Sequence, residues 1–371
     1  MIDAPGPWGT GPFTLVEGYS SLETIMAIQR VRPEFVATNL ITGEDRTPRV
    51  VLEANLTHNS GRMAELERVV FVNDLSPQEA LDAVCDRVGE IDIVTEVGPA
   101  DAARVKASEH ADLIAIDANR LLVGIFNTWP DAPLSDERVR LAINLAVDRH
   151  KLAEETLLGY ATPMASLTPA WCNGIFPDAI ARRQDAGQAK ALMAEAGWPA
   201  HRALRIATPG GFAGLAETIA ADVREALGIE VELFVVPDEE LLPASRALVE
   251  KKLPPMWDVL MHGWFDLSSD LPPAVVHREF FGDTGAFRAG PEDPQFDALF
   301  TEMAQCIDPE RCRELAEKID LLCFEHSKAL FLCSPQALYA VNKEVDFKAY
   351  RATFELADTT VSEAHWSRRT E

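Results

Sequence analysis

Residues 133–149 read PLSDERVRLAINLAVDR, and this stretch does most to decide the fold. Asp136 and Glu137 are acids of the kind that stabilise a helix N-terminus by complementing its dipole. Apolar residues then recur at helical spacing from Val139 to Val147, and Gly159 ends the segment. The pattern predicts the clearest helix of the chain.

Strands and helices alternate on both sides of this helix. Upstream, the β-branched run Glu67–Val72 precedes a predicted helix that starts after Ser76. Downstream, Asp185 is expected to cap a helix that stops at Gly197, and an alternating strand is expected over Ile229–Val236. Regular alternation of this kind predicts an α/β fold built in layers.

Composition narrows the class of protein. The 371 residues are 47% apolar and 25% charged, which is ordinary for a globular protein of two domains. The net charge of −25 disfavours nucleic acid and anionic membrane surfaces as partners. No apolar run is long enough to span a bilayer, so membrane insertion is not expected. Six scattered cysteines predict buried, reduced thiols, and we expect neither a metal site nor a cofactor.

Several short motifs follow one another along most of the chain. They are PWGTGPF at 7–13, GEIDI at 89–93, Phe126-Asn127, the stretch at 133–149, GYA at 159–161, the segment 185–197, and Trp257-Asp258 with Gly263-Trp264. In this order they resemble the family 5 bacterial solute-binding proteins, which are the dipeptide-, oligopeptide- and nickel-binding components of ABC importers. Most of these residues are of types that hold a scaffold, such as glycines that end helices.

The resemblance implies a fold and a division of the chain. We expect a type II periplasmic-binding-protein-like α/β fold, with two lobes, a hinge cleft and a reduced first lobe. Lobe one would comprise residues 1–119 and 340–371, and would be incomplete because family members begin well before the GTGP turn. Lobe two would comprise residues 120–339. The segments Asp117–Phe126 and Pro335–Val341 are expected to run side by side where the chain crosses between lobes.

The resemblance also implies a ligand site. In peptide-binding relatives an Asp shortly after the Gly-Trp pair binds the ligand's amino group, which points to Trp264 and to Asp266 or Asp270. Asn127 and Trp129 follow the crossover strand and are expected to face the same cleft. The alternatives are a solvated loop of turn-forming residues for the two acids and hinge packing for Trp129. No catalytic set is proposed.

We therefore expect a module that closes on a small polar or cationic ligand, either peptide-like or another small molecule. Its partner would be an ABC permease, or a partner chain that supplies the N-terminal part of lobe one. The alternatives are a cytoplasmic enzyme of lyase or hydrolase type on the same scaffold, or a subunit completed by another chain. The N-terminus as given shows no secretory signal, which predicts a cytoplasmic location, or a periplasmic or cell-surface one if an N-terminal segment is missing.

Overall fold

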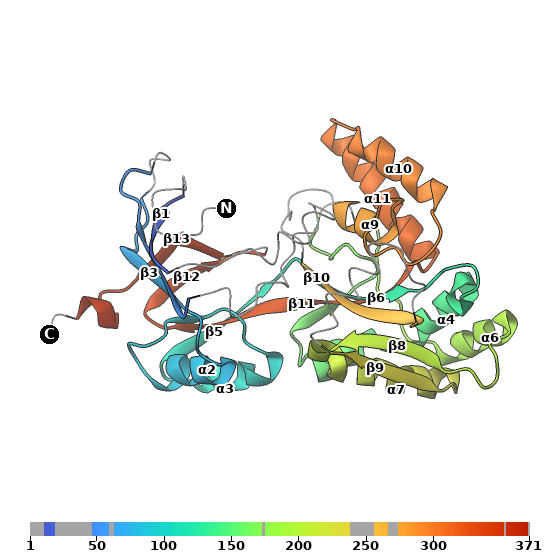
Figure 1. Ribbon diagram of the computed structural model, residues 1–371, viewed down its shortest axis with the longest axis horizontal. Helices are drawn as coiled ribbons and strands as arrows, with labels where there is room; N and C mark the ends of the chain where they lie inside the picture. The colour runs from blue at the N-terminus through green and yellow to red at the C-terminus, as the bar shows by residue number, and fades with distance from the viewer. Residues whose placement is uncertain are drawn as a thin grey trace. The chain divides into compact units, whose positions relative to one another are not determined.

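The computed structural model divides the chain into two units (Figure 1). Unit 1 comprises Met1–Ile116 with Ala337–Glu371, and unit 2 comprises Asp117–Gln336. That these units are the two lobes of a binding protein stays a prediction. The residues that the structure describes are 11–18, 47–58, 63–172, 175–237, 256–265, 274–351 and 354–369.

A mixed sheet organises unit 2. Strand β10 pairs antiparallel with β6 and parallel with β8, and β8 pairs parallel with β9. Strand β6 also pairs antiparallel with β11, which pairs antiparallel with β7 as well. The strands are β6 Arg120–Phe126, β7 Ala161–Pro163, β8 Leu204–Pro209, β9 Val231–Val236, β10 Val259–Phe265 and β11 Ala329–Asn342.

Several helices of unit 2 begin or end at predicted residues, but the predicted helix before Gly159 is interrupted: α4 ends at Ala146, Val147 is extended, and α5 begins at Arg149. The Asp136 carboxylate accepts a hydrogen bond from the Arg138 amide at the start of α4. Gly197 and Gly228 end α6 and α7 with φ of 72° and 69°, in the left-handed region that favours glycine. The helices are α4 Glu137–Ala146, α5 Arg149–Lys151, α6 Ala186–Ala196, α7 Ala213–Leu227, α9 Ala274–Phe281, α10 Pro294–Ala304 and α11 Pro309–Glu325.

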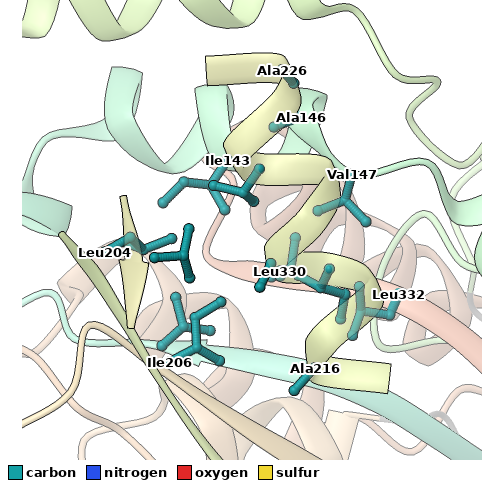
Figure 2. Close-up of a cluster of buried hydrophobic side chains, with 14 of the residues drawn as sticks. Ile143, Ala146, Val147, Leu204, Ile206, Ala216, Ala226, Leu330 and Leu332 are labelled. Carbon is teal, nitrogen blue, oxygen red and sulfur yellow. The ribbon is translucent and has the colours of Figure 1, made fainter. Parts of the chain in front are cut away.

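Helices cover both faces of this sheet. One apolar cluster joins α4, α6 and α7 to β8, β10 and β11. Figure 2 shows part of it, with Ile143 of α4, Leu204 and Ile206 of β8, and Leu330 and Leu332 of β11 drawn together. Helices α9, α10 and α11 lie on the other side of the sheet (Figure 1). A sheet buried on both faces in this way is expected to be strongly stabilised by apolar burial.

Arg149 ties the helical layer to the sheet. Its side chain is 1% exposed and donates to the carbonyl oxygens of Phe331 and Asn144, at 2.5 and 2.7 Å, and to the Asn144 side-chain oxygen at 2.7 Å. Burial lowers the pKa of this guanidinium to about 9. The last residue of the fold-deciding stretch therefore holds the scaffold together.

Unit 1 contains smaller sheets. The three-stranded sheet has the order β1-β2-β3, and both pairings are antiparallel. Helix α2 begins with a capping box between Ser76 and Glu79, as the sequence suggests. The elements are β1 Phe13–Glu17, β2 Arg49–Ala54, β3 Arg68–Val72, α2 Pro77–Asp86, β4 Ile93–Val94, α3 Ala102–Ala107, β5 Ala111–Asp117, β12 Val345–Ala349 and β13 Phe354–Val361.

The chain passes between the units twice, once between residues 116 and 117 and once between 336 and 337. The Gln336 amide donates to the Asp117 carboxylate at 3.0 Å, and the Ser334 hydroxyl donates to the Ala118 carbonyl at 3.3 Å. Beyond this point Ala340 pairs with Val94 of unit 1. The two segments therefore meet at residues 117 and 336, whereas the rest of the first segment, β6, pairs with Ala329–Cys333. That these segments cross between two lobes stays a prediction.

Candidate functional site

The topology of unit 2 defines one edge of its sheet. The parallel strands β8 and β10 end at Pro209 and Phe265, so their carboxyl ends lie on the same side. Strand β6 is antiparallel to β10 and therefore begins there, at Arg120. We call this the carboxyl edge. Ligands of open α/β sheets bind outside the carboxyl ends of parallel strands, which makes this edge the first place to look for a site.

Trp264 lies one residue from the end of β10. Side chains alternate along a strand, so His262 and Trp264 share one face. The Trp264 ring packs edge-on against Phe280 and Phe287, with centroids 5.9 and 5.5 Å apart. Its buried indole nitrogen, Nε1, has no hydrogen-bond partner among the residues that the structure describes. A buried donor without an acceptor is costly, so this nitrogen is a candidate ligand contact.

His262 belongs to the same aromatic group. Its ring centroid lies 4.3 Å from that of Phe287 and 5.8 Å from that of Phe280. Burial of the ring lowers the pKa of His262 to about 4. The imidazole is therefore neutral near pH 7 and adds no positive charge beside Trp264.

The opposite face of β10 meets the segment that follows β8. A Cβ atom at Gly263 would lie 2.7 Å from the Phe212 ring, which is closer than packing allows. Glycine at this position therefore lets Phe212 sit directly against the strand. The segment Thr208–Gly214, which contains no arginine, therefore lies at the carboxyl edge on the face of β10 opposite the Trp264 ring.

Asn119 supplies a second buried donor close to the start of β6. Its side chain is 4% exposed, and its Oδ1 atom accepts a hydrogen bond from the Trp171 indole at 3.4 Å. Its Nδ2 atom finds no acceptor within the described ranges. Asn119 precedes Arg120, which pairs with Phe265, so it lies next to the end of β10. Our sequence reasoning missed Asn119, although it is the one amide side chain in the largely apolar segment AIDANRLLVGIF, which could have signalled it.

Asn127 and Trp129 lie elsewhere. Trp264 pairs with Leu121 of β6, and Asn127 lies six residues after Leu121. At about 3.3 Å per residue, Asn127 is therefore about 20 Å from the residue that pairs with Trp264. The Asn127 side chain donates to the Trp257 carbonyl at 3.2 Å and accepts from the Trp129 amide at 3.4 Å. The expectation that these residues share one site with Trp264 is wrong, because β6 runs away from the carboxyl edge. Ligand binding by either residue stays a prediction.

The acidic residues divide into two groups. Asp266 and Asp270 lie outside the described residues, so their pairing with a ligand stays a prediction. Asp258 is buried at the other end of β10, where Arg202 donates to both carboxylate oxygens at 2.8 and 2.7 Å. Asp258 of the Trp257-Asp258 motif thus forms a structural ion pair with Arg202.

Another buried polar cluster surrounds Asp320 in α11. One carboxylate oxygen lies 2.5 Å from the Ser166 hydroxyl, 2.8 Å from the Thr168 hydroxyl and 2.9 Å from the His277 ring. All four residues are almost fully buried. Ser166 donates to the aspartate rather than to the histidine, so the cluster lacks the arrangement that activates a serine nucleophile. We assign it to packing between α9, α11 and the segment before α6.

In the part of the chain that the structure describes, no group of three or more His, Cys, Asp or Glu side chains could hold a metal ion. Across the same ranges, no helix combines the length and apolar character needed to cross a bilayer.

The α/β fold described above is that of the type II periplasmic binding proteins. CtaP from Listeria monocytogenes, an ABC transporter substrate-binding protein, superposes with a TM-score of 0.77 at 20% identity, over 96% of this chain and 67% of that one. NikA from Brucella suis, in complex with Fe(III)-EDTA, superposes with a TM-score of 0.74 at 19% identity, over 95% of this chain and 68% of that one. DppA from Helicobacter pylori, in complex with the peptide STSA, superposes with a TM-score of 0.70 at 18% identity, over 95% of this chain and 63% of that one.

Residues 3–285 match the model of the bacterial extracellular solute-binding proteins, family 5 (middle region), and the chain belongs to this family. It is 24% identical over 281 residues to the periplasmic oligopeptide-binding protein OppA of Salmonella typhimurium. It is also 27% identical over 199 residues to a probable deoxycholate-binding periplasmic protein, YgiS, of Escherichia coli. The matches cover 73% and 51% of this chain, but only 50% and 35% of those relatives.

Proposed function

We propose that the chain binds a short peptide, or a polar ligand of similar chemistry, at the carboxyl edge of unit 2 and closes on it. The family and the OppA and DppA relatives support a peptide-like ligand. We further propose that it works outside the cytoplasmic membrane and delivers its ligand to an ABC permease, as its family does.

One observation carries the proposal. The Trp264 Nε1 and Asn119 Nδ2 atoms are buried donors at one edge of the sheet, and neither has an acceptor among the described residues. Buried polar groups are nearly always satisfied, so donors left open at a place where ligands bind point to an acceptor supplied from outside. Peptide carbonyl and carboxylate oxygens are acceptors of this kind.

The aromatic surroundings support the same ligand class. The Trp264 ring offers apolar surface beside the open indole donor, and the buried rings of Phe280 and Phe287 hold it in place. Binding sites for small molecules typically combine such surface with a few placed polar groups. We propose that Asp266 or Asp270, which follow Trp264 closely in the sequence, bind the ligand's ammonium group.

A matched pair of tryptophan variants tests the proposal. Trp264→Phe removes the open donor together with part of the ring, whereas Trp198→Phe makes the same change at an indole whose nitrogen already donates to the Arg202 carbonyl at 3.0 Å. Calorimetric titration with a panel of peptides of two to five residues, including STSA, would first identify a ligand. We expect Trp264→Phe to weaken its binding about tenfold with little loss of stability, since about 1.4 kcal/mol corresponds to a lost hydrogen bond to a polar or charged group.

Trp198→Phe should behave in the opposite way. It should leave the affinity unchanged and lower the free energy of unfolding by about 1 kcal/mol. Failure of the whole panel to bind wild-type protein would reject the peptide class. Equal affinities for wild type and Trp264→Phe would reject the carboxyl edge as the site.

A further inference from the structure

Two cysteines meet at the turn between α10 and α11. Cys306 follows the end of α10, and its amide donates to the Met303 carbonyl at 3.1 Å. Cys312 lies in the first turns of α11, where its amide donates to the Asp308 carbonyl at 2.8 Å. The Cys312 thiol donates to the Cys306 carbonyl at 3.2 Å. Backbone hydrogen bonds therefore hold both residues in place, with the Cys312 sulfur over Cys306.

The Cys306 thiol faces the same turn, because it donates to the Asp308 carbonyl at 3.4 Å. A hydrogen bond with the Cys306 side chain is the largest cause of a raised pKa at the Cys312 thiol, and the nearby Asp308 carboxylate raises it further. Both residues are half-buried, whereas Cys85, Cys323 and Cys333 are buried. The pair is thus two neighbouring thiols near the surface, and both are free.

We propose that Cys306 and Cys312 form a dithiol that a small-molecule disulfide oxidises to an intramolecular disulfide. This differs from the sequence-based expectation that the thiols stay reduced. The family is extracellular, and oxidising surroundings are where such bonds form and persist.

The reaction proceeds by two thiol–disulfide exchanges. The Cys306 thiolate attacks one sulfur of the small-molecule disulfide, whose S–S bond breaks and releases one thiolate. The Cys312 thiolate then attacks the Cys306 sulfur of the mixed disulfide and displaces the second thiolate. Two protons and two electrons pass from the protein to the oxidant, so one disulfide is made for each one reduced. Cys306 attacks first, because the raised pKa of Cys312 disfavours its thiolate.

The surroundings also fix the pH dependence of the reaction. The carboxylates of Asp308, Glu310 and Glu314 lie on the same turn and helix start, while Arg311 is paired with Glu302 and Glu314, and Arg313 with Glu310 and Glu317. An acidic setting with its cations already paired disfavours thiolates. The rate of oxidation should therefore rise from pH 7 to pH 9.

Oxidised glutathione is a suitable probe. After incubation and removal of the probe, thiols are counted in denaturant and the intact mass is measured for wild type, Cys306→Ser, Cys312→Ser and the control Cys172→Ser. Wild type should lose two of its six thiols and about 2 Da, reversibly with a phosphine reductant. Cys172→Ser should likewise lose two thiols.

The serine variants separate the two steps. Cys312→Ser should stop at a stable glutathione adduct on Cys306, because the resolving thiol is absent. Cys306→Ser should react at least tenfold more slowly than wild type. Retention of all six thiols by wild type, a persistent glutathione adduct on Cys306 or Cys312 of wild type, or a peptide map that joins any other pair of cysteines would overturn the proposal.

Discussion

Units 1 and 2 bury similar sequence patterns to different extents. In unit 2, Leu204 and Ile206 of β8 are 0% and 1% exposed, because α4 and α7 cover them. In unit 1, Val70, Phe71 and Val72 of β3 are 37%, 36% and 40% exposed. Both runs are apolar and β-forming in the sequence. A strand pattern predicts a strand, whereas its burial depends on which helices are present to cover it.

The comparison also explains where the site lies. The sheet of unit 2 is fixed from both faces, so its carboxyl edge can hold side chains such as Trp264 in one position. A rigid scaffold that presents a few side chains at one edge is the usual design of a binding site. This edge holds two buried donors without an acceptor among the described residues, Trp264 Nε1 and Asn119 Nδ2. Other buried side-chain atoms of unit 2 that lack a partner there belong to Arg182, Arg288 and Ser327.

The largest contrast should appear in the apolar cores. Ile143 is fully buried beneath the sheet of unit 2, and Ile143→Ala should lower the free energy of unfolding by about 3 kcal/mol or more. The matched change in unit 1, Phe71→Ala, should cost less than about 1 kcal/mol despite the larger side chain. Urea unfolding measures both. Similar losses for the two variants would show that β3 is covered in solution.

The next effect concerns pH. The pKa of His262 is lowered to about 4 in the fold, against about 6.5 in the unfolded chain. Between these values the unfolded state binds more protons, so stability falls as pH decreases. Wild type should lose about 2 kcal/mol more than His262→Phe between about pH 7 and about pH 5. Parallel stability curves for the two proteins would contradict this assignment.

A close approach at the carboxyl edge gives an effect of similar size. Gly263→Ala places a methyl group against the Phe212 ring and should cost about 2 kcal/mol. Combining it with Phe212→Ala should remove most of that cost, because the clash is gone. A double-mutant cycle by thermal or urea unfolding checks this. Additive losses would place the strain elsewhere.

The smallest effect is expected at the surface of unit 1. Phe71→Lys should change the free energy of unfolding by about 0.5 kcal/mol or less, since the side chain is already 36% exposed. Size-exclusion chromatography with light scattering provides the control for association. A large loss of stability or a change of mass would mean that another surface packs against β3.

The sequence predicted local features and missed those set by distant contacts. The caps at Asp136 and Asp185 and the glycine at 197 follow from neighbouring residues, and they are found where expected. The placement of Asn127 failed because the register of β6 against β10 is set by residues more than a hundred positions apart. The open donor of Asn119 could not be foreseen, since it depends on which acceptors the fold leaves within reach.

The most direct test of the carboxyl edge observes its indole donors. In ¹⁵N-labelled protein the seven tryptophans give separate indole N–H signals, which single Trp→Phe variants assign. On titration with a peptide that binds, we expect the Trp264 signal to shift as its Nε1 gains an acceptor, while the Trp198 signal stays in place. A shift at Trp198 with none at Trp264 would contradict the proposal that unit 2 binds ligand at its carboxyl edge.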